Sequence, residues 1–264
     1  SNVVFQGVTT QAIFQQSGNP NLEPEKADTL TYGVVLRPGF IPGLQLSADR
    51  FDIKIEDAIG TLTLQNTIDQ CAAGNTLACA QFQVQPGLIT GRLQPLNLNV
   101  QEVSGWDFEA SYSRPVGTGN IRFRGLVTHL TEAFQQVPGG VPLILLGQPQ
   151  TPEWSGLGSI DYDQDRFGLN ASVRYIGRAI NDPNRPLDDL ERQRIPAVAY
   201  VNLSGRFRFG PGGEPPYELY AVVNNLFNEQ PPSSTRRPSS YNEPVNLTYD
   251  TIGRYFTLGV KAAF

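Results

Sequence analysis

Apolar and polar residues alternate over the last segment of the chain. The even positions are apolar, and the odd positions are mostly small or polar; the even set is Phe256, Leu258, Val260, Ala262 and Phe264. A period of two predicts a β-strand with one apolar face. A soluble strand can alternate in this way too, with its apolar face on a core. The segment is long enough to span a bilayer, and in a membrane barrel its apolar face would meet lipid and its polar face would line the lumen.

The same alternation recurs in eight earlier segments, which predicts about nine strands in all. In the second segment the apolar phase changes at Arg50–Phe51, and such a change suggests a β-bulge. The eight expected strands cover about residues 27–37, 44–55, 96–112, 121–130, 154–162, 167–178, 200–209 and 217–228.

The connections between these segments are alternately short and long, which is typical of outer-membrane barrels. Aromatic residues near the strand ends fit two interfacial girdles. Charged residues fall on the other face and are expected to face the lumen: Asp107, Glu109, Arg122, Arg124, Arg174, Arg206 and Glu218. The pattern therefore predicts an all-β fold, an antiparallel transmembrane β-barrel segment. A soluble sandwich or propeller also has many short strands, but it does not need charges along one face of strands this long.

Composition narrows the class of protein. The 264 residues contain no apolar run near the roughly 20 residues of a membrane helix, and the longest run is 141–146. The net charge of −5 argues against nucleic acid as a partner. The chain has no Met and shows no signal peptide, so we expect it to be a processed or truncated piece of a longer protein.

The two cysteines, Cys71 and Cys79, lie in a small, polar stretch within an expected loop at 58–93. A disulfide here closes a loop of about nine residues and contributes roughly 2–3 kcal/mol on the chain-entropy estimate. It implies an oxidising compartment, whereas two free thiols would suit the cytosol. The other evidence for an exported protein favours the disulfide.

Candidate chemistry is sparse. The single histidine, His129, is in phase with Phe123 and Val127 on the apolar face, so no Ser-His-Asp set includes it. An acidic cluster offers oxygens to Ca²⁺, but its spacing matches no known loop and a solvated loop is favoured; its members are Asp182, Asp188, Asp189 and Glu191. We expect no enzymatic activity, no cofactor and no bound metal.

Three motifs make the assignment more specific. They are Gly18-Asn-Pro-Asn-Leu-Glu-Pro-Glu25, Val223-Asn-Asn-Leu-Phe-Asn228 and Tyr249-Asp-Thr-Ile-Gly-Arg254 before the last strand. Together and in this order they resemble motifs of the TonB-dependent outer-membrane receptor family. The matching residues in the first two are Asn19, Pro20, Pro24, Glu25, Asn224, Asn225, Leu226 and Phe227.

The last eight residues are similar to the signal by which outer-membrane barrels are recognised for insertion. The pattern is polar, x, Gly, x, x, apolar, x, aromatic, and the matching residues are Thr257, Gly259, Ala262 and Phe264. The resemblance implies that the barrel-assembly machinery reads this segment.

The resemblance implies a 22-stranded barrel in the Gram-negative outer membrane, filled by an N-terminal plug. Residues 1–26 would be a loop leading into the barrel, and residues 27–264 its C-terminal part, without plug or earlier strands. Implied partners are outer-membrane lipid, the chain's own plug and N-terminal strands, and the TonB–ExbB–ExbD complex acting through the N-terminus.

Energised uptake of a ferric siderophore, cobalamin or an oligosaccharide is the implied function. The alternatives are a passive porin-type or adhesin barrel, and a soluble β-rich carbohydrate-binding module.

Overall fold

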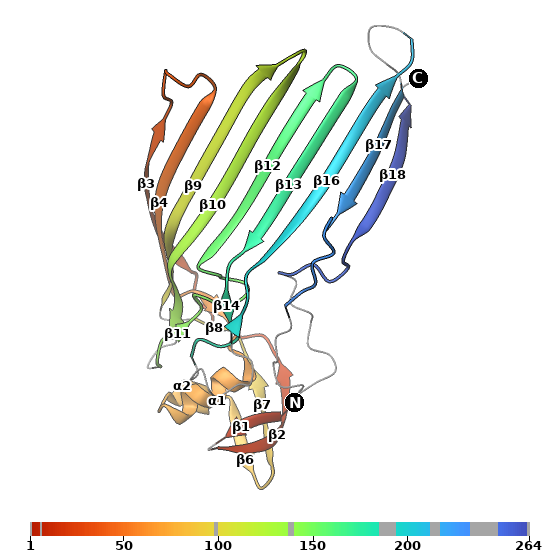
Figure 1. Ribbon diagram of the computed structural model, residues 1–264. Helices are drawn as coiled ribbons and strands as arrows, with labels where there is room; N and C mark the ends of the chain where they lie inside the picture. Colours follow the sequence, from red (N-terminus) through yellow and green to blue (C-terminus); the bar gives the residue numbers. More distant parts are fainter. Residues whose placement is uncertain are drawn as a thin grey trace.

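The computed structural model consists of one large, open antiparallel sheet with a small α/β unit at one end (Figure 1). It describes residues 2–5, 7–97, 100–136, 140–184, 194–211, 217–232 and 248–262. Among these residues, no helix is long and apolar enough to cross a membrane.

The large sheet confirms the antiparallel strands predicted from the alternation. Its strand order is β18-β17-β16-β13-β12-β10-β9-β4-β3, and β11 (Leu143–Ile144) pairs with β10. The nine strands are β3 (Lys26–Leu36), β4 (Leu44–Glu56), β9 (Val100–Val116), β10 (Gly119–Gln136), β12 (Trp154–Gln164), β13 (Phe167–Ile176), β16 (Val198–Phe209), β17 (Tyr217–Asn224) and β18 (Tyr255–Ala262).

The two ends of the sheet differ. The connections after β3, β9, β12 and β16 meet at one end, which we call the turn end (Figure 1). The longer connections after β4, β10, β13 and β17 meet at the other, which we call the loop end. β18 runs from the loop end to the turn end, where the chain finishes (Figure 1).

The strand register gives the sheet an apolar face and a polar face. Phe123 of β10 lies between Tyr112 of β9 and Ile160 of β12. Val127 likewise faces Phe108. These side chains and their neighbours form the apolar face. Every strand has large apolar side chains that are exposed, so within the described structure no core packs over this face. The alternate positions form the polar face.

The bulge expected at Arg50–Phe51 in β4 is wrong. β4 pairs in unbroken register with β3 and with β9. Beyond Arg50, apolar residues occupy positions on the polar face because a small core covers that face there. Ile55 packs against a buried cluster of Ala58, Leu62 and Leu143. The register shift of the large sheet lies in β10, between Leu130 and Glu132.

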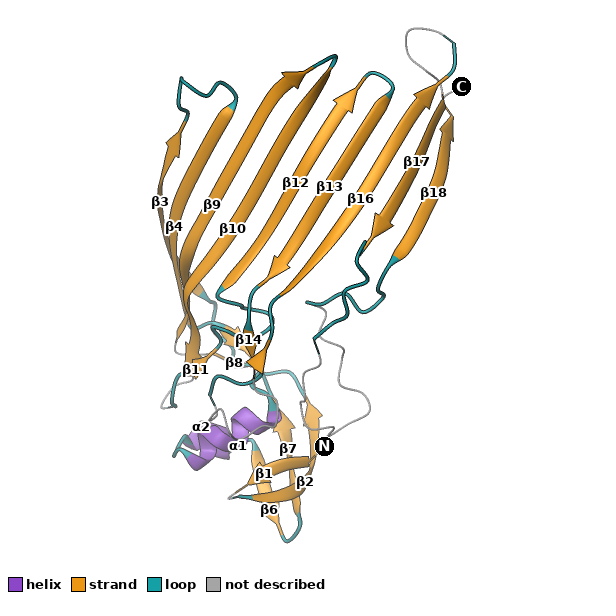
Figure 2. Cartoon of the chain, viewed as in Figure 1, coloured by secondary structure: helices purple, strands orange, loops and turns teal. Residues whose placement is uncertain are grey.

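Residues 1–26 and 58–93 contain more structure than the expected loops (Figure 2). A four-stranded sheet of order β1-β2-β7-β6 pairs β2 with β7 in parallel, and two helices accompany it. Its elements are β1 (Asn2–Phe5), β2 (Val8–Gln16), α1 (Leu64–Ala72), α2 (Thr76–Cys79), β6 (Phe82–Gln85) and β7 (Leu88–Leu93). Two short pairs complete the loop end, β5 (Ile59–Gly60) with β8 (Leu96–Asn97) and β14 (Ala179–Ile180) with β15 (Arg194–Ile195).

Local capping explains the two helices. The side chain of Thr63 accepts a hydrogen bond from the Asn66 amide at the start of α1, and Asn75 caps α2 in the same way. Ile68 of α1 is buried in a core with Val3, Ala12, Phe82 and Ile89. We call the four-stranded sheet with α1 and α2 the loop-end unit.

A disulfide joins Cys71 of α1 to Cys79 of α2, with their Cα atoms 4.7 Å apart. The pairing favoured by the sequence is therefore present in the structure. Because the bond closes the short segment between the two helices, it restricts the unfolded chain and stabilises the helical corner.

Candidate functional site

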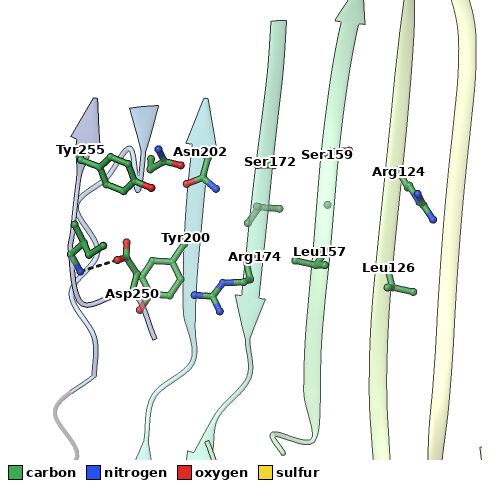
Figure 3. Close-up of a pocket in the computed structure, with 14 residues that line it drawn as sticks. Arg124, Leu126, Leu157, Ser159, Ser172, Arg174, Tyr200, Asn202, Asp250 and Tyr255 are labelled. Carbon is green, nitrogen blue, oxygen red and sulfur yellow. Dashed lines mark hydrogen bonds between the residues drawn. The ribbon is translucent and has the colours of Figure 1, made fainter. Parts of the chain in front are cut away.

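A row of hydrogen-bonding side chains crosses the polar face. The register aligns Arg124 with Ser159, Ser159 with Ser172, and Ser172 with Asn202. Asn224 pairs with Tyr255 beside them. We call these six residues the polar row. Figure 3 labels all of them except Asn224 on their strands. Side chains on one face recur at every second position of a strand, and the register places one such position of each strand in this row.

The polar row lines a cavity of about 740 Å³. Its other walls include Leu126 and Leu157 on one side and Asp250 on the other (Figure 3), and Ile252 also lines it. The volume lies in the roughly 300–1,000 Å³ range of ligand cavities, and the mixture of apolar and hydrogen-bonding walls is typical of them. The arrangement can bind and orient a ligand.

Arg174 anchors a neighbouring segment of this wall. Its Nη1 donates a hydrogen bond of 2.8 Å to the Thr248 carbonyl, and its guanidinium lies 5.1 Å from the centre of the Tyr200 ring. Tyr249 is buried with Tyr200 and Val198 in one cluster. Burial raises the pKa of the Tyr249 hydroxyl, with a smaller effect from Tyr200.

The predicted lumen-facing charges all lie on the polar face, and most are paired there. Arg124 contacts Glu109 at 3.0 Å, and Asp107 accepts a hydrogen bond of 2.6 Å from Thr128. Nearer the turn end, Asp163 is shared by Arg206 and, at 4.0 Å, Arg122, and Arg208 pairs with Glu218 at 2.9 Å.

The first family motif binds the segment before β3 to the connection between β4 and β9. Asn19 donates to the Pro95 carbonyl at 3.0 Å, and a Glu25 carboxylate oxygen accepts from the Ile59 amide. Pro20 and Pro24 are exposed. The motif thus holds the chain against both ends of the connection between β4 and β9.

The second family motif divides into buried and exposed residues. Asn225 is only 1% exposed, whereas the Phe227 side chain is 71% exposed. The Leu226 amide donates to the Val201 carbonyl at 2.7 Å. The Asn225 side chain bonds the local backbone at Glu229; a further partner, Asp250, lies 25 residues away in the third motif.

The residues similar to an insertion signal lie on β18, except Phe264, which is outside the described residues. Thr257 and Gly259 are on the polar face and Ala262 is on the apolar face. Gly259 lies beneath the Tyr220 ring, where an added Cβ would come 2.3 Å from the ring hydroxyl.

The structure brings no catalytic set together at His129. Its ring stacks on Trp154 with a centroid distance of 4.0 Å on the apolar face. Within the described ranges no group of three or more His, Cys, Asp or Glu side chains is placed to hold a metal ion. Of the acidic cluster considered for Ca²⁺, Asp188, Asp189 and Glu191 lie outside those ranges.

Comparison with known proteins identifies the family. The family model described as "TonB dependent receptor-like, beta-barrel" matches residues 2–226. The chain belongs to this family. Its members are outer-membrane receptors and transporters of Gram-negative bacteria, not enzymes, and the match favours a receptor barrel over a soluble carbohydrate-binding module. The comparison with curated sequences gives no match.

Solved structures of receptor-family proteins share the fold. A ferric enterobactin receptor (PfeA) variant from Pseudomonas aeruginosa is 16% identical with a TM-score of 0.59, and the FrpB iron transporter from Neisseria meningitidis is 18% identical with 0.57. The siderophore receptor PirA from Acinetobacter baumannii is 16% identical with 0.57. The matches cover 94% of this chain and 32–33% of those proteins, so the chain spans about a third of their length.

Proposed function

We propose that this chain is the C-terminal part of the barrel of a TonB-dependent outer-membrane transporter that takes up a scarce nutrient with energy from the inner membrane. One observation carries the proposal: large apolar side chains stand exposed along one face of nine strands, with Leu258 78% and Val260 68% exposed. A face of this size is unfavourable in water and favourable in lipid.

In this proposal the turn end faces the periplasm and the loop end faces the outside, as in other barrels with short periplasmic turns and long outer loops. The loop-end unit and its disulfide then lie at the cell surface. Intact cells treated with a membrane-impermeant reductant should expose Cys71 and Cys79 to an impermeant thiol label. Labelling only after the outer membrane is opened would contradict this orientation.

The polar face then lines the lumen, where it meets the plug and the passing ligand. The cavity supplies apolar walls, hydroxyls, amides and Arg174 for ligand contact. The ion pairs at the turn end keep the lumen wall hydrated and offer charges to the plug. Partners at other sites are the lipid, the barrel-assembly machinery and the TonB–ExbB–ExbD complex.

Transport by the full-length protein tests the function. The protein is expressed in a Gram-negative strain without related receptors, and uptake is measured for radiolabelled ferric siderophores, cobalamin and oligosaccharides. We expect saturable uptake of at least one class, which is lost when TonB is deleted. Uptake that does not saturate and persists without TonB would indicate a passive barrel instead.

A further inference from the structure

The last two family motifs meet in one hydrogen-bonded assembly between β17 and β18. Asn225 Nδ2 donates to the Asp250 carboxylate at 2.9 Å and to the Glu229 carbonyl at 2.9 Å. Its Oδ1 accepts from the Glu229 amide at 2.8 Å. The other Asp250 oxygen accepts from the Ile252 and Gly253 amides. We call the Asn225–Asp250 pair, with these backbone partners, the latch.

The backbone at the latch explains the residue types. Asn225 and Asn228 have φ of 49° and 56°, and Gly253 has φ of 81°. Asn and Gly tolerate this left-handed region better than other residues do. Asn228 Oδ1 accepts from the Arg254 amide at 3.0 Å, which fixes the segment that leads into β18.

The latch is tied to the sheet and to the cavity. The Asn225 amide donates to Asn202 Oδ1 at 2.9 Å, and Asn202 belongs to the polar row. Asp250, the second member of the latch, forms one wall of the cavity together with Ile252. Arg174 holds the same wall through the Thr248 carbonyl. Breaking the latch would therefore remove one of the contacts that hold this wall, two residues from the Thr248 carbonyl that Arg174 binds.

We propose that Asn225 is a positioning residue, which sets ligand access to the cavity by holding residues 248–253 against the polar face through Asp250. The inference rests on the proposed function for its biological meaning, because it concerns the wall of the proposed ligand passage. Asn225 lies outside the lining of the cavity and acts through Asp250.

A thiol-labelling rate tests the latch without any ligand. Ser172→Cys places a reporter in the cavity wall of the full-length protein, with other free thiols replaced by serine and the Cys71–Cys79 disulfide kept. The probe is a small, uncharged methanethiosulfonate, so that the change of charge at Asp250 does not itself alter the labelling rate. Asn225→Asp sets two carboxylates against each other, and Asp250→Asn removes the charged acceptor. Each should raise the labelling rate, by roughly tenfold for Asn225→Asp, as expected for the loss of a charge-assisted hydrogen bond.

The double substitution Asn225→Asp with Asp250→Asn restores an amide–carboxylate pair in the opposite direction. Because Asp at position 225 cannot donate to the Glu229 carbonyl, the double variant should label more slowly than Asn225→Asp but faster than the parent protein. Phe227→Ala is the matched control, since Phe227 is in the same motif but exposed, and its rate should equal that of the parent. A second reporter, Ser47→Cys on the polar face of β4 away from the cavity, should label at one rate in all variants.

The proposal would be overturned if the Ser172→Cys reporter labels at the parent's rate in Asn225→Asp while the amount of heat-modifiable barrel also equals that of the parent. Faster labelling in Asn225→Asp that the double substitution does not reduce at all would overturn it as well. If Asn225→Asp yields no folded barrel, Asp250→Asn alone tests the proposal. A labelling rate equal to that of the parent in Asp250→Asn then contradicts it. Because labelling needs neither ligand nor TonB, a failed transport experiment leaves this test intact.

Discussion

At the scale of single residues, the family motifs mainly supply hydrogen bonds within the chain. Asn225 directly follows β17, and its side chain bonds the nearby backbone of Glu229. Its bond to Asp250 could not be predicted, because the pairing depends on how the intervening connection folds back. The polar row was missed for the same reason: Ser172 and Asn202 carry no signal until register aligns them.

Gly259 gives a prediction at this scale. Gly259→Ala forces a Cβ into the Tyr220 ring, so we expect less heat-modifiable barrel, from an overpacking cost of about 1–3 kcal/mol. Combining Gly259→Ala with Tyr220→Ala should recover most of the barrel, because the clash is removed. The amount of heat-modifiable protein in outer-membrane fractions measures both. If the double variant stays as low as the single one, the assembly machinery reads the glycine itself.

At the scale of elements, periodicity predicted the strands of the large sheet well because each has one face against a single environment. It failed where the environment changes. The phase shift at Arg50 marks the point where β4 gains an inner core at Ile55, not a bulge. The loop-end unit was missed because α1 is short and polar, and because β2 pairs with β7 across more than seventy residues of sequence.

Gln65 gives a prediction for the loop-end unit. Its side-chain amide donates to the Val4 carbonyl and accepts from the Val4 amide, both at 2.9 Å, and so occupies the free edge of β1. Gln65→Ala should speed hydrogen exchange at Val4, since the amide loses its partner. Gln15→Ala, at an exposed position of β2, is the control and should leave Val4 unchanged. Equal exchange in both variants would show that Gln65 does not protect this edge.

At the scale of the whole molecule, the nine strands form an open wall with edges β3 and β18, and in the proposed barrel both edges pair with further strands. Open edges are not tolerated in lipid, so assembly and insertion are coupled. The fold class could be predicted from periodicity because the environment acts on every strand alike. The substrate could not, because it depends on residues brought together from many strands and on the rest of the protein.

The terminal aromatic gives a prediction about assembly. In the full-length protein, Phe264→Ala should strongly reduce heat-modifiable barrel in the outer membrane, because the terminal aromatic resembles the residue read for insertion. Phe256→Ala removes a 68% exposed aromatic from the apolar face and should reduce the amount less. Near-normal levels for both variants would leave Phe264 as an ordinary interfacial residue.

The central claim is that the apolar face meets lipid and the polar face lines an aqueous lumen. Spin labels placed singly from Phe256 to Ala262 in the full-length protein, reconstituted in bilayers, test it by power saturation with oxygen and with a water-soluble nickel chelate. We predict a period of two, with oxygen contact highest at Phe256, Leu258, Val260 and Ala262, and nickel contact highest at Thr257, Gly259 and Lys261. The opposite phase, or no alternation along β18, would contradict the account.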